Sequence, residues 1–108
     1  MGESLGEFEQ LVMFAVLRLD DDAYGNAIRE ELRARAERDV SPGAIFTTLE
    51  RLESRGLVSS RYGEPTAERG GRRKRFYRLS ADGRRALARA LRTMKRMAHG
   101  LEPKLARS

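Results

Sequence analysis

The chain has 108 residues, a net charge of +6, one histidine and no cysteine. The lack of cysteine excludes disulfides, thiol redox sites and cysteine-based zinc sites. A lone His99 is a poor basis for a transition-metal site, because such sites usually need several imidazole or sulfur ligands. We expect no metal and no cofactor.

Charge is distributed unevenly along the chain. Residues 1–22 hold six acids and one base, whereas residues 69–96 hold twelve bases and one acid. The sequence pI is about 10.5. Such segregation favours a polyanion partner for the basic segment, with a merely solvated helix face as the alternative.

The N-terminus is acidic, where a signal peptide needs positive charge. The longest apolar run, Leu11 to Leu17, is far shorter than the roughly 18 residues of a membrane span. We expect a soluble, cytoplasmic protein with no membrane partner.

A first helix is predicted over residues 4–19, with Ser4 as its N-cap and Glu7 completing a capping box. Apolar residues lie nearly all round this helix, so it should be buried on more than one side. One side would pack on its own domain. We expect the other side to meet a second subunit.

Two further helices are predicted downstream. The acidic run 20–22 should cap a helix over residues 23–36, which is a simpler explanation than a metal site. The next helix has Ser41 as its cap, Pro42 in its first turn and Gly56 at its end. Its inward stripe is Ile45, Leu49 and Leu52, and its outward face carries Gly43, Thr47, Glu50, Arg51 and Ser54.

Residues 57–62 and 75–79 read as two antiparallel strands, joined by a long loop with Gly70 and Gly71 at its tip and the basic run 72–75. A helix followed by such a hairpin is typical of a recognition helix with a basic wing laid on phosphates. The alternative is a polar loop without a partner.

A last helix should begin at the cap Ser80 and end or kink near Glu102, before Pro103. Its apolar residues follow a heptad seam that predicts helix pairing, either between subunits, which we favour, or back onto the first helix. The predicted seam is Leu87, Leu91, Met94, Ala98, Leu101 and Leu105.

Several segments together resemble the PadR family of transcriptional regulators. They are LGEFEQLVMFAVLRL, DDAYGNAIREEL, VSPGAIFTTLERLESRGLV and GGRRKRFYRLSADGRRAL. The resemblance covers about residues 4–92, and the short C-terminal segment is similar to that of the small subgroup. It implies a dimeric winged helix-turn-helix protein that represses genes at a palindromic promoter site.

The resemblance and the helix faces together give the predicted contacts to double-stranded DNA. These are Tyr24, Gly25, Ser41, Gly43, Thr47, Thr48, Arg51, Arg69, Arg72, Arg73 and Lys74. Two residues depart from the family pattern: Phe46 stands where tyrosine is usual, and Glu50 where a basic or neutral residue is usual. Family members that bind a small-molecule effector often do so at the dimer interface, where this chain offers Met94 and Met97.

We therefore expect a mainly α fold with a small antiparallel β-hairpin. Residues 1–79 form the winged helix-turn-helix domain, and residues 80–108 form a C-terminal dimerisation helix of a homodimer. No nucleophile–base pair, carboxylate pair or phosphate-binding loop is visible, so an enzyme is not expected. The alternative function is a winged-helix module that binds another protein, an option kept open by Phe46 and Glu50.

Overall fold

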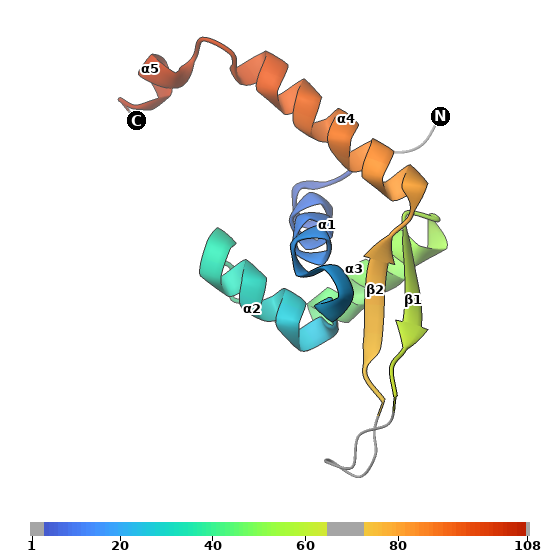
Figure 1. Ribbon diagram of the computed structural model, residues 1–108. Helices are drawn as coiled ribbons and strands as arrows, with labels where there is room; N and C mark the ends of the chain where they lie inside the picture. Colours follow the sequence, from blue (N-terminus) through green and yellow to red (C-terminus); the bar gives the residue numbers. More distant parts are fainter. Residues whose placement is uncertain (1–3, 65–72, 108) are drawn as a thin grey trace.

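The computed structural model describes residues 4–64 and 73–107 and confirms the predicted winged-helix fold (Figure 1). The described elements comprise five α-helices, a short 3-10 turn and a two-stranded sheet. In chain order they are α1 (Glu7–Leu19), η1 (Asp20–Asp22), α2 (Gly25–Ala36), α3 (Pro42–Ser54), β1 (Val58–Tyr62), β2 (Arg75–Leu79), α4 (Ala81–Ala98) and α5 (Glu102–Leu105).

Helix α1 begins three residues later than predicted. Its N-cap is Gly6, whose backbone N–H donates to the Glu9 carboxylate at 2.8 Å. The residues before it stay extended because Leu5 packs against the core, and because its carbonyl accepts a hydrogen bond from Gln10. The predicted capping box of Ser4 and Glu7 is therefore wrong.

The start of α2 also differs from prediction. The acidic run forms the 3-10 turn η1 and does not cap α2, whose N-cap is Tyr24. The physical reason is the fully buried Ala23, whose carbonyl accepts from the Tyr77 N–H at 2.8 Å. Tyr24 also forms an isolated antiparallel bridge with Phe76. Residues 23 and 24 thus extend the sheet before the helix begins.

Helix α3 follows its sequence signals closely. The Ser41 hydroxyl accepts the Ala44 N–H at 3.1 Å, and Pro42 occupies the first turn. Beyond the last turn, Gly56 has φ +76°, a conformation that favours glycine. The predicted inward stripe is confirmed, because Ile45, Leu49 and Leu52 are all buried.

Strands β1 and β2 form the predicted antiparallel hairpin, with Val58 opposite Leu79 and Tyr62 opposite Arg75. Successive side chains alternate between the two faces of a strand. Val58, Tyr77 and Leu79 are accordingly buried against the helices. The predicted tip of the wing, residues 65–72, lies outside the described residues.

One hydrophobic core joins α1, α2 and α3 to the hairpin. It is centred on α1, which buries Val12, Met13 and Val16 almost completely. Helix α1 contacts α2, α3, β2 and α4, so its broad apolar surface is largely used within the chain. Leu17 is exposed, and Phe8, Leu11 and Phe14 are only partly buried, so the expected contact of α1 with a second subunit stays a prediction.

A tight junction ties the end of α3 to the start of α4. The Ser80 hydroxyl donates to the Gly56 carbonyl at 2.7 Å and accepts the Gly83 N–H at 2.9 Å. The Ser80 N–H donates to the Leu57 carbonyl at 3.0 Å. A Cβ at Gly83 would lie 2.0 Å from that same carbonyl oxygen, so glycine is required there.

Helix α4 leaves the domain and projects beyond α1, carrying α5 at its far end (Figure 1). The radius of gyration is 15.8 Å, whereas a compact chain of this length would have about 13 Å. Helix α4 ends at Ala98, before the predicted stop, because Gly100 takes φ +81°. Pro103 does not end α4; it lies in the first turn of α5.

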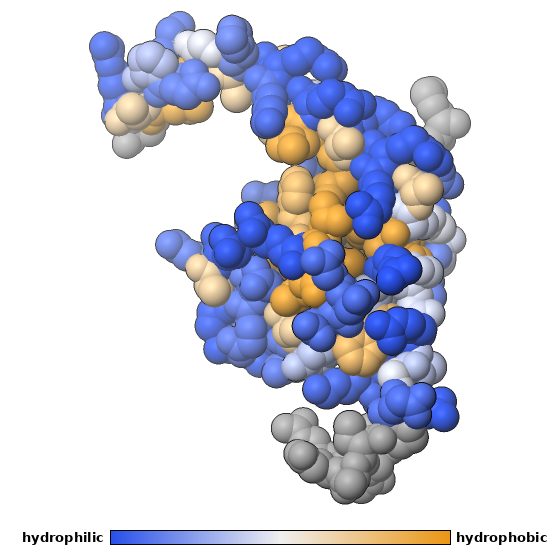
Figure 2. All heavy atoms as spheres, in the orientation of Figure 1, coloured by the Kyte–Doolittle hydropathy of each residue, from blue (hydrophilic) through white to orange (hydrophobic). Residues whose placement is uncertain are grey.

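The predicted heptad seam divides into two parts. Leu87 is 3% exposed and belongs to the chain's own core, so its assignment to a dimer seam is wrong. Beyond it, apolar side chains stay exposed on α4 and α5, and Figure 2 shows apolar atoms gathered where α4 faces the body of the domain. The exposed set is Leu91, Met94, Met97, Leu101 and Leu105.

No helix in the described part of the chain is long and apolar enough to span a membrane.

Candidate nucleic-acid interface

The outward face of α3 presents four of the predicted DNA-contacting residues. Gly43, Thr47 and Arg51 are exposed along it. Ser41 is exposed at the start of the helix, although its hydroxyl already accepts the capping hydrogen bond. Thr47 and Arg51 lie one helical turn apart, so they can address neighbouring base pairs.

Thr48 does not belong to this face. Its side chain is 4% exposed and lies within the core, on the inner side of α3 beside Leu49. A residue four positions before Leu52 shares the inward stripe of the helix. Thr48 is therefore removed from the predicted DNA-contacting set.

A half-open groove of about 500 Å³ lies between the start of α2, α3 and the hairpin. Tyr24 and Gly25 reach it from α2, Phe46 from α3, and Tyr62 and Lys74 from the hairpin. The structure therefore brings the predicted contacts Tyr24, Gly25 and Lys74 together. Phe46 forms part of one wall and is 52% exposed, so its ring is available to a partner.

Lys74 is held at the edge of this groove by an aromatic ring. Its ammonium nitrogen lies 4.1 Å from the centroid of the Tyr24 ring, which in turn meets Phe76 edge-on at 5.7 Å. A cation over an aromatic face gains electrostatic stabilisation while remaining in water. Lys74 therefore presents its positive charge from a defined position.

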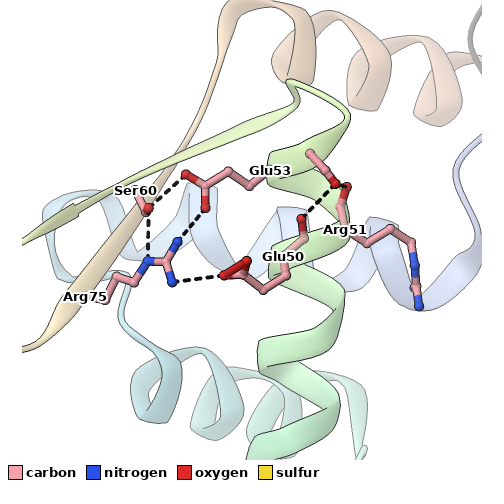
Figure 3. Close-up of polar contacts among 6 residues, drawn as sticks. Glu50, Arg51, Glu53, Ser60 and Arg75 are labelled. Carbon is pink, nitrogen blue, oxygen red and sulfur yellow. Dashed lines mark hydrogen bonds and ion pairs between the residues drawn. The ribbon is translucent and has the colours of Figure 1, made fainter.

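Glu50 is hydrogen-bonded within the chain. The guanidinium of Arg75 donates to the Glu50 carboxylate at 2.9 Å and to the Glu53 carboxylate at 2.8 Å (Figure 3). It also donates to the Ser60 hydroxyl at 3.0 Å, and that hydroxyl donates to Glu53 at 2.9 Å. Figure 3 shows Arg51 directed away from this cluster. The acidic residue that departs from the family pattern is thus paired with a cation of its own chain, which it shares with Glu53.

Two aromatic rings flank the same guanidinium. Its carbon lies 5.4 Å from the Tyr77 ring centroid and 5.9 Å from that of Tyr62. Burial acts to lower the pKa of Arg75, but Tyr77, Glu50 and Glu53 raise it overall. Burial raises the pKa of the Tyr77 phenol, which Arg75 partly offsets. Arg75 is therefore always charged and Tyr77 neutral near pH 7.

The end of the described hairpin nearest the connecting loop carries further cations. Arg73 and Lys74 are exposed, and Arg61 lies 4.8 Å over the Phe76 ring. Arg69 and Arg72, also predicted to contact DNA, lie outside the described residues. Arg61, Arg73 and Lys74 make the described part of the hairpin a positively charged neighbour of α3, as a wing on a phosphate backbone requires.

Residues 13–89 match the sequence profile of the transcriptional regulator PadR-like family. The chain belongs to this family. The match runs from the middle of α1 to the middle of α4, and therefore includes α3, the hairpin and the junction between α3 and α4.

Known relatives agree with this assignment. The transcriptional regulator Rv3488 of Mycobacterium tuberculosis is 35% identical over 79 residues, which cover 73% of this chain and 69% of that protein. The fold is similar to that of a PadR family transcription regulator from hypervirulent Clostridium difficile, with a TM-score of 0.71, 26% identity, and coverage of 91% and 98% of the two chains. A PadR family transcriptional regulator from Eggerthella lenta has a similar fold, with a TM-score of 0.67 and 25% identity. The similarity covers 92% of this chain and 86% of that one. These proteins are regulators of transcription and not enzymes.

For a PadR-like regulator, the sequence interpretation missed the cluster around Arg75. The alternation of side chains along β2 indicated an inward-facing Arg75, because Arg75 falls on the same face of the strand as Tyr77 and Leu79. A charge on a core-facing position needs an acidic partner. Glu50 and Glu53, one turn apart on the preceding helix, were the available acids.

In residues 4–64 and 73–107, no group of three or more His, Asp or Glu side chains is arranged to hold a metal ion.

Proposed function

We propose that this protein is a homodimeric repressor that binds a palindromic promoter site through α3. The observation that carries the proposal is the state of charge on α3. Its outward face exposes Thr47 and Arg51, while the carboxylate of Glu50 is held by Arg75. A helix offered to the major groove in this way presents a base-reading arginine beside a carboxylate that is already hydrogen-bonded to Arg75.

The elements beside α3 support the same function. The start of α2 and the hairpin border one groove with α3, and Lys74 is fixed there as an exposed cation. When a recognition helix lies in the DNA major groove, the adjacent DNA phosphate backbone passes beside the helix, within reach of residues around it and of the wing. We assign phosphate contacts to Tyr24, Gly25, Arg73 and Lys74, together with Arg69 and Arg72 of the wing.

The exposed apolar side chains beyond Leu87 support dimerisation through α4. Leu91 and Met94 keep heptad spacing on α4, which projects from the domain, and Leu101 lies exposed between α4 and α5. A contiguous apolar stripe of this kind is normally covered by a partner. Symmetric dimers match palindromic operators, because each recognition helix meets one half-site. An effector bound at this interface stays a prediction, and it would contact Met94 and Met97.

The test is binding of the wild-type protein to duplexes enriched from a random-sequence library, compared with one fixed random duplex at one salt concentration. Arg51→Ala should weaken binding to the enriched duplex by about 1–3 kcal/mol and relax one base preference per half-site. Binding to the random duplex should weaken less.

Arg35→Ala is the matched control. Arg35 is an exposed arginine at the end of α2 remote from the groove, and it pairs with Glu31 on its own helix. This control loses the same charge and should leave both affinities within about twofold of wild type. No enrichment of any duplex, or equal losses on both DNAs for Arg51→Ala, would refute base reading by α3.

A further inference from the structure

The contacts of Arg75 join two elements that meet DNA separately in the proposed function. Glu50 and Glu53 belong to α3, whereas Arg75 and Ser60 belong to the two strands of the hairpin. One planar guanidinium therefore links both carboxylates of α3 to the hairpin, with donor–acceptor distances of 2.9, 2.8 and 3.0 Å. Arginine suits this position because its fork of donors has a fixed geometry.

The surroundings of Arg75 make this link more rigid than an ordinary surface ion pair. The side chain of Arg75 is 26% exposed, that of Glu53 is 32% exposed and that of Glu50 is 43% exposed. Tyr62 and Tyr77 flank the guanidinium. Isolated surface pairs contribute little, partly because two free side chains must be ordered. Here the guanidinium is ordered by three acceptors and two rings.

The position of this link along the hairpin matters as much as its strength. Arg75 pairs with Tyr62 at the last described rung of the sheet, farthest from the Val58–Leu79 pair that is buried in the core. Beyond Arg75 the described hairpin carries exposed residues, including Arg73 and Lys74. Among the described residues, the Arg75 cluster is thus the outermost hydrogen-bonded side-chain connection between α3 and the hairpin.

We infer that Arg75 is a positioning residue, which sets the wing at a fixed offset from α3 and does not itself contact DNA. Its charge is consumed by Glu50 and Glu53, so it differs in role from Arg73 and Lys74. Without the link, the hairpin would keep its contacts with Tyr24 at the start of α2 but lose its side-chain bonds to α3. The hairpin would then shift against α3, and the two would no longer engage one operator together. The expected effect of Arg75 on DNA affinity rests on the proposed function, whereas its effect on the distance between α3 and the hairpin does not.

The offset is measured in the full chain by electron paramagnetic resonance. Spin labels are attached at Ala44→Cys on α3 and Glu64→Cys beyond β1, both exposed positions in a chain without native cysteine. Labelled protein is diluted with unlabelled protein so that distances within one chain dominate. Arg75→Gln should broaden the distance distribution, and Glu50→Gln combined with Glu53→Gln should broaden it similarly.

Arg78→Gln is the control for the removed charge. Arg78 lies on the same strand but is 69% exposed, and it pairs only loosely with Asp21, at 3.4 Å. It should leave the distance distribution unchanged. An unchanged distribution in Arg75→Gln would overturn the inference, whatever the protein binds.

Affinity for the enriched duplex gives the second readout, at a temperature where circular dichroism shows every variant folded. Arg75→Gln should weaken binding at least about tenfold, and the salt slope on a random duplex should stay constant. If Arg75 bound a phosphate directly, its replacement would instead reduce that slope by about 0.9, which would overturn the inference.

Arg75→Lys keeps the charge but lacks the fork, and it should recover only part of the affinity. Full recovery by lysine would show that charge alone suffices and would also overturn the inference. A wild-type protein that binds no duplex would refute the proposed function, and the distance measurement would still decide the role of Arg75.

Discussion

Replacing Gly83 with alanine tests the junction between α3 and α4. The new Cβ would lie 2.0 Å from the carbonyl oxygen of Leu57, 2.9 Å from its carbonyl carbon and 3.3 Å from its Cα. All three are backbone atoms, so no flexible side chain can move aside. The start of α4 and the turn after α3 must separate by about 1 Å, a form of overpacking.

Three contributions determine how much Gly83→Ala lowers the free energy of unfolding. Overpacking costs about 1–3 kcal/mol, and the separation strains the two hydrogen bonds from Ser80 to Gly56 and Leu57, each worth about 1 kcal/mol. Alanine returns up to about 1 kcal/mol through its better helix propensity. The free energy of unfolding should therefore fall by about 2–4 kcal/mol, which lowers Tm by roughly 10–20 °C in a domain of this size.

Thermal unfolding followed by circular dichroism measures this destabilisation, with Gly43→Ala as the control. Gly43 also lies in the first turn of a helix, but a Cβ there would meet nothing nearer than the Ser41 hydroxyl at 3.9 Å. Gly43→Ala should be neutral, or stabilising by up to about 1 kcal/mol. A Tm for Gly83→Ala within roughly 3 °C of wild type would refute the packing argument.

Three further outcomes are expected. Leu91→Asp combined with Leu101→Asp should convert a dimer into a folded monomer in sedimentation equilibrium at micromolar concentration, because both side chains are 40% exposed on the proposed interface; an unchanged mass would exclude this face. Replacing Arg72, Arg73 and Lys74 with alanine should weaken binding to enriched and random duplexes by similar factors and lower the salt slope by up to about 0.9 for each phosphate that is no longer neutralised; weaker binding to the enriched duplex alone would contradict phosphate binding. Because the pKa of Tyr77 is raised on folding, the unfolded chain releases its proton first, so its contribution to stability is present below about pH 10 and is lost as pH rises through the folded pKa; denaturant unfolding of Tyr77→Phe should show a shallower alkaline decline than wild type.

The local sequence signals predicted α3 and the hairpin well. Ser41, Pro42 and Gly56 act within a few residues of themselves, so the bounds of α3 needed no tertiary information. The alternation of β2 likewise indicated its strand and its buried face. These are cases in which local preference and the final fold agree.

The start of α2 could not be predicted in the same way. The acidic run has good capping chemistry, but the carbonyl of Ala23 is used by Tyr77, more than fifty residues away in the chain. The pairing with β2 overrides the local preference. Gly83 is a similar case, because only the approach of Leu57 makes glycine necessary there.

Helical periodicity separates inner from outer faces but does not say what an outer residue touches. It placed Glu50 on the outward face, where the structure shows a bond to Arg75 across to the hairpin. Thr48 was assigned to DNA, although its stripe position beside Leu52 indicates the buried side. Leu87 followed the heptad pattern equally well and packs in the core of its own chain.

The junction at Ser80 also makes α4 a lever arm. The helix has 18 residues, which at 1.5 Å per residue corresponds to about 27 Å. A tilt of about 10° at its anchored end moves the far end by about 5 Å, more than the roughly 3.4 Å rise of one base pair. Because Ser80 and Gly83 fasten this anchor to the last turn of α3, small changes in the angle of α4 set how far apart two joined copies of α3 would stand.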